Sequence, residues 1–444
     1  MISNIRQVFR EANDGFEFYY THQYDKSGNL IERKFGSAEC DYMSAAWHRV
    51  STDNGKTWGE WITDLNDAED GRKGMIPYGD DEDQELGEIR EPDFYDEDSG
   101  CTIGISNINY IIRGHAVGYF EKWKYGCDYD FYHSYFSFRK PNGELVTRLI
   151  RFEEGPEYRS APRDMEYLKK NRVLIATLDH PDQSSPFLRA PDGTLIFLAF
   201  PSMRLCCKLA GVDVNRYFPS CPDLVSGLLV GHLKWIPEKE DYEITYSNPI
   251  MVSDMQSSRG VAEPVIAFLP SGRWVIAYRG SNKKLTQWNA RIDPKTPGFK
   301  WFTYSDDCGK TWSVSMPWHF DTQEVVYSSA SFSATFRSSK TGDWYWVGNI
   351  CEPSSIYGND PRNTLHICQI DPTYGHLIKD TLRVIDTRRE GEGPQTELSN
   401  FNLFENRETK ELEIRLSKCN MHEGTEQIKG DWYGEAWEYY ISFE

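Results

Sequence analysis

Two stretches of the chain share one pattern: Ser51–Trp58 reads STDNGKTW and Ser305–Trp312 reads SDDCGKTW. Both fit S-x-D-x-G-x-T-W, and strand-like runs of aromatic and β-branched residues flank each of them. An Asp side chain can accept hydrogen bonds from the amides of its own turn, and Gly readily adopts a positive φ. The pattern therefore predicts a tight turn between two strands, closed by a Trp that packs against a sheet.

A longer unit recurs around these turns: a strand, a turn with Gly or a charged pair, and a second strand. The copies are Glu91–Ser106, Ser185–Phe200, Glu263–Arg279, Ser329–Asn349 and Leu398–Ser417, with Ile5–His22 as a sixth. Because a single sheet of this kind cannot bury both faces, the copies are expected to close into a ring. We predict an all-β, six-bladed β-propeller of four-stranded antiparallel blades, which forms one domain over residues 1–444.

The ends of the chain bear on how this ring closes. The last blade ends on Ala436–Phe443 (AWEYYISF), and the N-terminal residues are expected to supply its missing strand. Seven blades is the alternative, because residues 204–253 could hold more than one hairpin.

Composition excludes several classes of function. Lys and Arg number 49 against 68 Asp and Glu, a net charge of −19 that disfavours nucleic acids and anionic membranes as partners. No apolar run approaches the roughly 20 residues of a membrane span. The N-terminal sequence MISNIRQVFREANDG lacks the apolar segment of a secretory leader, so a cytoplasmic protein is expected unless a leader was removed.

The S-x-D-x-G-x-T-W pattern is that of the Asp box, or bacterial neuraminidase repeat, and the chain resembles the sialidase superfamily of propellers. The resemblance implies a structural role for Asp53, Trp58, Asp307 and Trp312, at a distance from the catalytic centre. It also places an active site over the central axis, built from the residues that open each repeat.

Sialidases hold the carboxylate of their substrate with three arginines, whose guanidinium groups bind carboxylates bidentately. Arg90 stands in an R-E-P phrase that resembles the family's R-I-P. Arg279 follows Glu263 by one hairpin, as a second family arginine follows a blade-opening glutamate. Arg362, in NDPRNTLHICQI, loosely resembles the third. The resemblance implies substrate binding by the three arginines and a catalytic or orienting role for Glu263.

The catalytic residues depart from the family pattern. Leu398-Ser399 stands where sialidases carry the Tyr nucleophile, and residues 101–127 contain no Asp to act as acid or base. His115 in this segment is a candidate for proton transfer near neutral pH. Glu397 is a candidate replacement carboxylate.

Two further residues are candidates for the pocket. His180, between Asp179 and Asp182, leads into an inner strand, and Tyr357 lies in the phrase IYGNDPR. Cys206, Cys207, Cys221 and His232 do not have the spacing of a zinc site, and no phosphate-binding loop occurs, so neither a metal nor a cofactor is expected.

These features predict a sialidase-like glycoside hydrolase that releases a terminal, acidic sugar from an oligosaccharide or glycoconjugate. One alternative is a lyase on the same kind of propeller, using His115 or His180 with a Tyr to cleave uronate-containing glycans. The other alternative is a propeller that binds glycans without catalysis.

Overall fold

The computed structural model describes most of the chain. The described residues are 2–14, 17–25, 27–37, 45–66, 84–86, 89–111, 130–152, 170–176, 178–180, 183–285, 289–293, 295–419 and 433–444.

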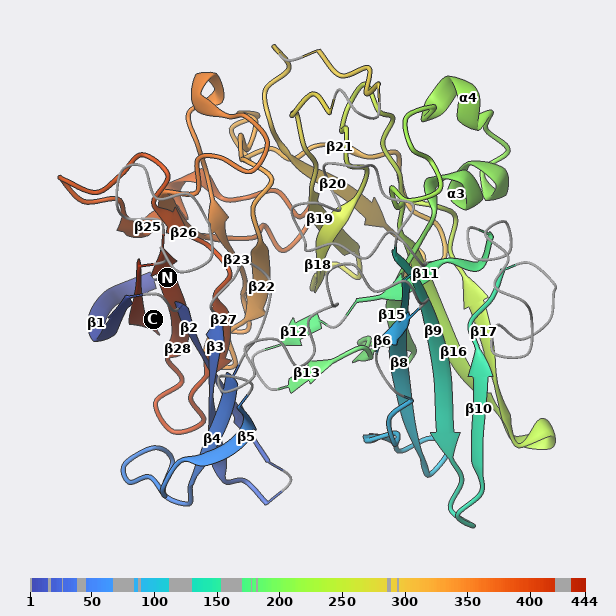
Figure 1. The fold of residues 1–444 in the computed structure, drawn as a ribbon, viewed down its shortest axis with the longest axis horizontal. Helices are drawn as coiled ribbons and strands as arrows, with labels where there is room; N and C mark the ends of the chain where they lie inside the picture. The colour runs from blue at the N-terminus through green and yellow to red at the C-terminus, as the bar shows by residue number, and fades with distance from the viewer. Residues whose placement is uncertain are drawn as a thin grey trace.

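Six antiparallel sheets follow one another along the chain and form a six-bladed propeller (Figure 1). The first sheet contains β2 (Glu17–Tyr24), β3 (Leu30–Ser37), β4 (Ala45–Ser51) and β5 (Ile62–Asn66). The second contains β6 (Gln84–Leu86), β7 (Phe94–Asp96), β8 (Cys101–Ile111), β9 (Asp130–Arg139) and β10 (Leu145–Leu149). The third contains β11 (Val173–Ile175), β14 (Leu188–Arg189), β15 (Leu195–Pro201), β16 (Leu229–Ile236) and β17 (Asp241–Tyr246).

The remaining three sheets complete the ring. The fourth contains β18 (Ala262–Phe268), β19 (Trp274–Arg279), β20 (Lys300–Ser305) and β21 (Met316–Pro317). The fifth contains β22 (Ser333–Arg337), β23 (Trp344–Asn349), β24 (Thr364–Gln369) and β25 (Arg383–Thr387). The sixth contains β26 (Glu397–Leu398), β27 (Asn402–Glu405), β28 (Leu412–Cys419), β29 (Tyr433–Phe443) and β1 (Ile2–Asp14).

The apolar core lies between neighbouring blades. Every residue of β15, β23 and β28 is buried, because these strands have a neighbouring blade on both faces. One core cluster joins the third sheet to the fourth through Ile196 and Ile276. Another joins the fifth sheet to the sixth. Packing of blade on blade therefore explains the nearly continuous apolar runs of β15 and β23, whereas β28 also buries the charged residues Glu413 and Arg415.

The N-terminal strand closes the ring, as predicted. β1 pairs with β29 in antiparallel fashion, with Ile5 opposite Ile441. The interpretation of Ile5–His22 as a sixth hairpin is wrong, because β2 pairs instead with β3 of the first blade. The two strands within that range thus belong to different blades, and the two chain ends meet in one sheet (Figure 1).

The seven-blade alternative is also wrong. Residues 204–253 contribute a single hairpin, β16 and β17, to the third sheet. Before it come two short helices, α3 (Met203–Leu209) and α4 (Val214–Tyr217). Ser202 caps α3 by accepting a hydrogen bond from the Leu205 amide, and Met203, Leu205, Cys206 and Cys207 of this helix are buried.

A separate two-stranded hairpin lies in the middle of the ring. It consists of β12 (Leu178–His180) and β13 (Gln183–Ser185). β12 lies beside β22 and β27, which are inner strands of the fifth and sixth blades (Figure 1). Across the described ranges, we find no helix long and apolar enough to cross a membrane.

Candidate functional site

Three charged residues of the fourth blade lie at one end of the ring. Glu263 is near the start of β18, Arg279 ends β19, and Lys300 begins β20. Adjacent strands run antiparallel, so these three positions meet at the same edge of the sheet. The register agrees, because Ala262 pairs with Arg279 and Arg279 pairs with Lys300.

A β-bulge directs Glu263 towards Arg279. The register shifts between Ala262 and Val265, and the backbone of Glu263 has a φ of 46°. Few residues other than Gly adopt this left-handed conformation, which is frequent at functional sites. Arg279 Nη2 lies 3.0 Å from Glu263 Oε1. The other carboxylate oxygen, Oε2, is buried and accepts no hydrogen bond from the described residues.

A second arginine–glutamate pair comes from the next two blades. Arg362 precedes β24 of the fifth blade, and Glu397 opens β26 of the sixth. Arg362 Nη1 donates a hydrogen bond of 3.1 Å to Glu397 Oε2. Burial lowers the pKa of Arg362, but the negative charges of Glu397 and Glu263 outweigh burial and raise it. This guanidinium therefore stays charged although it is buried.

The two arginines converge on one backbone carbonyl. Arg279 Nη1 donates a hydrogen bond of 2.9 Å to the Ala330 oxygen, and Arg362 Nη2 donates one of 3.1 Å to the same atom. Ala330 lies just before β22, the inner strand of the fifth blade. Three consecutive blades thus contribute to one cluster, which we call the axial cluster: Glu263, Arg279, Lys300, Arg362 and Glu397.

Lys300 is the fully buried cation of this cluster. Its ammonium donates a hydrogen bond to the Ser331 carbonyl, next to Ala330. Burial lowers its pKa to about 7; the positive charge of Arg279 lowers it further, while Glu263 opposes the shift. The protonation of Lys300 consequently changes near neutral pH, so the cluster gains or loses one positive charge there.

The structure brings together Glu263, Arg279, Arg362 and Glu397 of the residues that the sequence indicated. It also adds Lys300 and the Ala330 carbonyl, which sequence reasoning missed. A lysine flanked by aromatic residues in FKWFTY at the start of a strand was the available signal.

The remaining candidates are not part of the described cluster. Arg90 precedes β7, its side chain is exposed, and its amide donates to Ser106 Oγ at 2.9 Å. In the part of the chain that the structure describes, the Arg90 side chain makes no hydrogen bond or ion pair with the cluster. Tyr357 is half exposed, with its ring centroid 5.9 Å from Lys283 Nζ.

Both histidine candidates lack a described side chain. His115 lies outside the described residues altogether. The backbone of His180 ends β12, in the central hairpin beside β22 and β27, but its side chain is outside what the structure describes.

The two S-x-D-x-G-x-T-W turns have the same hydrogen bonds. Asp307 Oδ1 accepts from the Thr311 amide at 2.9 Å and Oδ2 from the Thr311 hydroxyl at 2.7 Å. Asp53 accepts from Thr57 in the same way, at 2.8 and 2.6 Å. The second turn follows the end of β20, and β20 begins at the axial cluster. This turn therefore lies at the opposite end of its blade from the candidate site.

None of Cys206, Cys207, Cys221 and His232 belongs to the axial cluster. Cys206 and Cys207 are buried in α3, and burial raises the pKa of the Cys207 thiol to about 11. His232 Nε2 lies 3.0 Å from the Gly309 carbonyl oxygen. Among the residues with described positions, no group of three His, Cys, Asp or Glu side chains could hold a metal ion.

No protein-family model matches the sequence, and no curated protein sequence matches it. Among solved structures, the chain is similar to a protein of unknown function from Dyadobacter fermentans, with 11% identity over 99% of both chains and a TM-score of 0.46. It is similar to the NanB sialidase from Streptococcus pneumoniae, with 12% identity, 99% of this chain and 70% of that chain covered, and a TM-score of 0.48. It is also similar to the intramolecular trans-sialidase from Ruminococcus gnavus, with 10% identity, coverage of 95% and 94%, and a TM-score of 0.45. At such identities and TM-scores, these similarities carry no argument about chemistry.

Proposed function

We propose that this propeller is a glycan-active enzyme, a glycoside hydrolase that releases a terminal acidic sugar at the axial cluster. The observation that carries the proposal is the convergence of Arg279 and Arg362, from two different blades, on the Ala330 carbonyl. Two guanidinium groups on one atom create a site where a carboxylate would receive charge-assisted hydrogen bonds.

Glu263 is the proposed catalytic carboxylate. Its bulged backbone places it at the Arg279 guanidinium, and Oε2 remains without a hydrogen bond from described residues. In hydrolysis the bond between the anomeric carbon and the glycosidic oxygen breaks, water supplies the new oxygen, and the leaving oxygen takes a proton. We assign water activation or nucleophilic attack to Glu263, and proton delivery to His180 or His115, whose side chains are not described.

Glu397 and Lys300 are proposed as positioning residues. Glu397 holds the Arg362 guanidinium through the 3.1 Å hydrogen bond. Lys300 holds the Ser331 carbonyl, and with it the loop that carries Ala330. Its charge near neutral pH adjusts how strongly the cluster attracts an anionic sugar.

The test is turnover of sialosides and uronate-containing oligosaccharides, followed by mass and by ultraviolet absorbance. Arg279→Ala is compared with Arg273→Ala, a matched control at the other end of β19, where Arg273 pairs with Asp306 at 2.7 Å. We expect a product with one added water from the wild type and from Arg273→Ala. We expect a loss of about a hundredfold or more in Arg279→Ala, the scale of removing a charged group that stabilises the transition state.

The other outcomes separate the alternatives. A product that absorbs in the ultraviolet and contains no added water would show that the reaction is β-elimination and not hydrolysis. Saturable glycan binding without turnover, with the same affinity in Glu263→Gln, would show that the propeller binds glycans and is not an enzyme. Equal turnover by Arg279→Ala and Arg273→Ala would show that the axial cluster is not the site of the reaction.

A further inference from the structure

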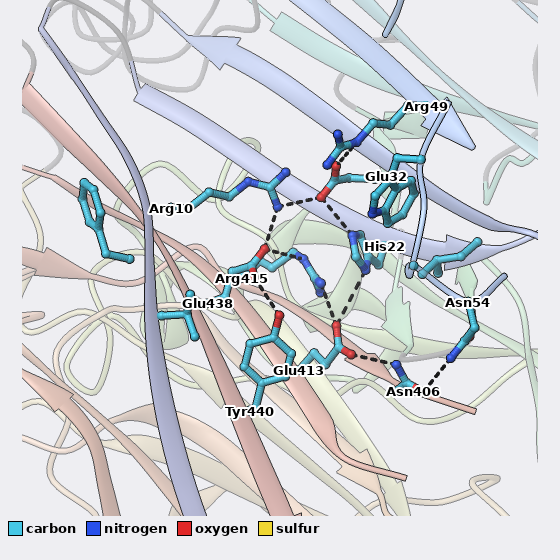
Figure 2. Close-up of a pocket in the computed structure, with 15 residues that line it drawn as sticks. Arg10, His22, Glu32, Arg49, Asn54, Asn406, Glu413, Arg415, Glu438 and Tyr440 are labelled. Atoms are coloured by element: carbon cyan, nitrogen blue, oxygen red, sulfur yellow. Dashed lines mark hydrogen bonds and ion pairs between the residues drawn. The ribbon is translucent and has the colours of Figure 1, made fainter. Parts of the chain in front are cut away.

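A polar cavity of about 490 Å³ lies where the ring closes. Its walls come from the first sheet and from the sixth sheet, including the N-terminal strand β1 (Figure 2). None of the axial-cluster residues lines it. We call it the seam cavity, because it occupies the junction between the two ends of the chain.

A buried carboxylate organises one side of the seam cavity. The Glu32 side chain is 1% exposed, and its two oxygens take three partners. Oε1 lies 2.6 Å from Arg10 Nη1 and 3.0 Å from His22 Nε2, and Oε2 accepts from Arg49 Nε at 2.5 Å (Figure 2). These contacts join β1, β2, β3 and β4 around one charge.

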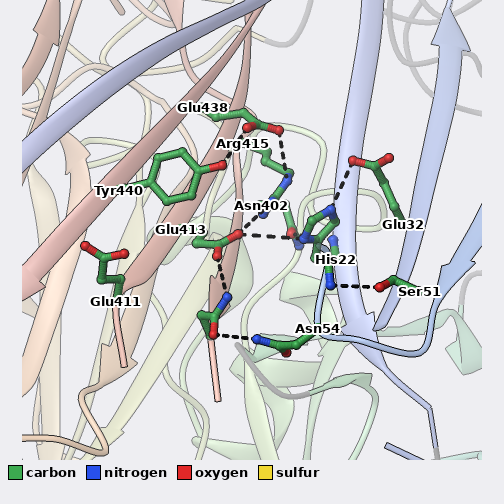
Figure 3. A network of polar contacts seen from close by, with 12 residues as sticks. His22, Glu32, Ser51, Asn54, Asn402, Glu411, Glu413, Arg415, Glu438 and Tyr440 are labelled. Atoms are coloured by element: carbon green, nitrogen blue, oxygen red, sulfur yellow. Dashed lines mark hydrogen bonds and ion pairs between the residues drawn. The ribbon is translucent and has the colours of Figure 1, made fainter. Parts of the chain in front are cut away.

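Arg415 organises the other side. Arg415 Nη2 donates a hydrogen bond of 2.6 Å to Glu413 Oε2. Glu438 Oε1 accepts from Arg10 Nη1 at 2.6 Å (Figure 2). Glu438 Oε2 accepts from the Tyr440 hydroxyl at 2.7 Å (Figure 3). The other oxygen of Glu413 accepts from Asn406 at 3.0 Å. Every carboxylate oxygen around the cavity therefore has a hydrogen-bond or ion-pair partner.

The unused hydrogen-bonding capacity consists of nitrogen atoms. Among the residues with described positions, Arg415 Nε and Nη1 have no hydrogen-bond partner although this side chain is only 2% exposed, and neither has His22 Nδ1. The nearest carboxylate oxygens lie 3.6 Å from Arg415 Nε and 3.7 Å from His22 Nδ1, beyond hydrogen-bond range. A buried donor without a partner costs about 1–3 kcal/mol, so a ligand that fits here offers oxygen acceptors to Arg415. His22 Nε2 faces the Glu32 carboxylate, which only accepts hydrogen bonds, so Nδ1 of the neutral imidazole is an acceptor that a hydroxyl group of the ligand can satisfy.

Charge narrows the class of ligand. The lining holds three arginines, Arg10, Arg49 and Arg415, and three glutamates, Glu32, Glu413 and Glu438, so their formal charges cancel. Burial lowers the pKa of His22 to about 4, with the positive charge of Arg415 adding to the effect, so His22 is neutral at pH 7. Val8, Phe9 and Trp58 add an apolar wall. A neutral molecule with many hydroxyl groups and an apolar face satisfies all three conditions.

We propose that the seam cavity binds a neutral, hydroxyl-rich ligand of the size of a mono- or disaccharide, whose oxygens accept hydrogen bonds from the arginines. The volume falls in the range of about 300–1,000 Å³ that small-molecule sites occupy. Such a ligand contacts both ends of the chain at once and stabilises ring closure. This site is independent of the function proposed for the axial cluster.

The test is calorimetric titration with D-glucose, D-galactose, D-mannose, N-acetylglucosamine and their disaccharides, alongside inorganic phosphate and glucuronate. Val8→Trp fills the cavity, and Arg49→Met removes N–H donors without shortening the side chain greatly. Val384→Trp, at an exposed position of β25, and Arg33→Met, on β3 outside the cavity, are the matched controls. Arg279→Ala is included to show whether a sugar binds at the axial cluster instead of the seam cavity.

We expect at least one neutral sugar to bind the wild type, both controls and Arg279→Ala, and to raise the melting temperature of each. Binding is expected to weaken about tenfold or more in Arg49→Met, the scale of losing hydrogen bonds to a charged donor. A similar loss is expected in Val8→Trp, because the indole occupies the space of the ligand. Failure of every neutral sugar to bind would overturn the proposal. So would preferential binding of phosphate or glucuronate, unchanged affinity in folded Val8→Trp, or loss of binding in Arg279→Ala, which would place the sugar at the axis instead.

Discussion

Glu263 and Arg279 form an ion pair of 3.0 Å between Oε1 and Nη2, and a left-handed backbone at Glu263 makes it possible. In a regular strand, neighbouring side chains alternate between the two faces of the sheet. The bulge after Ala262 breaks this alternation and turns the carboxylate towards the end of β19. Glu263 therefore has both a strained backbone and the carboxylate that we propose to be catalytic.

Replacing Glu263 by Gly and by Ala separates these two properties. Both variants remove the carboxylate, so both are expected to lose turnover. Gly adopts a φ of 46° without strain, whereas Ala retains a left-handed penalty of about 1–2 kcal/mol. We expect Glu263→Gly to exceed Glu263→Ala by about 1 kcal/mol in free energy of unfolding, measured by urea denaturation. Equal stability of the two variants would show that the bulge is not strained.

Lys300 predicts a pH dependence of stability. Its pKa is about 7 in the folded protein against 10.5 for an ordinary lysine. Between these values the unfolded chain binds a proton that the folded protein does not, so raising the pH favours folding. The stability of the wild type minus that of Lys300→Met is expected to rise by up to about 1.4 kcal/mol per pH unit above pH 7.

Urea denaturation from pH 7 to pH 9.5 measures this difference. Lys379→Met is the control, because Lys379 is partly exposed and pairs with Glu324. Parallel pH profiles for wild type and Lys300→Met would contradict a depressed lysine pKa. If the stability of the wild type minus that of Lys300→Met fell with rising pH, the pKa of Lys300 would be raised by folding and not lowered.

The two tryptophans of the repeated turn differ in burial, although the turns share their hydrogen bonds. Trp312 is 6% exposed within a core cluster, and its indole donates to the Gly309 carbonyl at 3.0 Å. Trp58 is half buried beneath Arg49, whose Cζ lies 4.8 Å from the ring centroid. We expect Trp312→Ala to cost about 3–5 kcal/mol of stability and Trp58→Ala about 1 kcal/mol. Thermal and urea denaturation of both variants check this order, which equal losses would refute.

Hairpins were predictable from the sequence because their information is local. Glu263–Arg279, for example, contains two apolar runs around P-S-G, which specify two strands and their turn within one segment. The pairing of Glu263 with Arg279 follows from the same hairpin. The convergence of Arg362 with Arg279 required the resemblance to a known family, because nothing local connects the two blades.

Long-range features were not predictable in the same way. β1 and β2 each carry a strand signal, and local sequence cannot show that the partner of Ile5 is Ile441. A lysine in a strand ordinarily faces solvent, so the burial of Lys300 emerges only when the blades pack. The seam cavity likewise combines charged residues from both ends of the chain. In the sequence, each of these residues resembles an ordinary exposed residue of a strand, so the cavity could not be predicted.

Closure of the ring by β1 is open to a test with proline. In an antiparallel ladder, the amides of successive residues point alternately towards and away from the partner strand. Of the neighbours Ile5 and Arg6, paired with Ile441 and Tyr440, one therefore directs its amide at β29. Proline at that position removes a ladder hydrogen bond and leaves a carbonyl without its donor.

We expect one of Ile5→Pro and Arg6→Pro to lose about 1–3 kcal/mol more stability than the matching alanine variant, and the other to lose much less. The alanine variants control for the side chains, since Ile5 packs on a core cluster and Arg6 lies over the Tyr440 ring. Because an opened ring exposes the edge of β29, the sensitive variant is also expected to self-associate, as size-exclusion chromatography would show. Proline tolerated at both positions would mean that the ring stays closed without this strand.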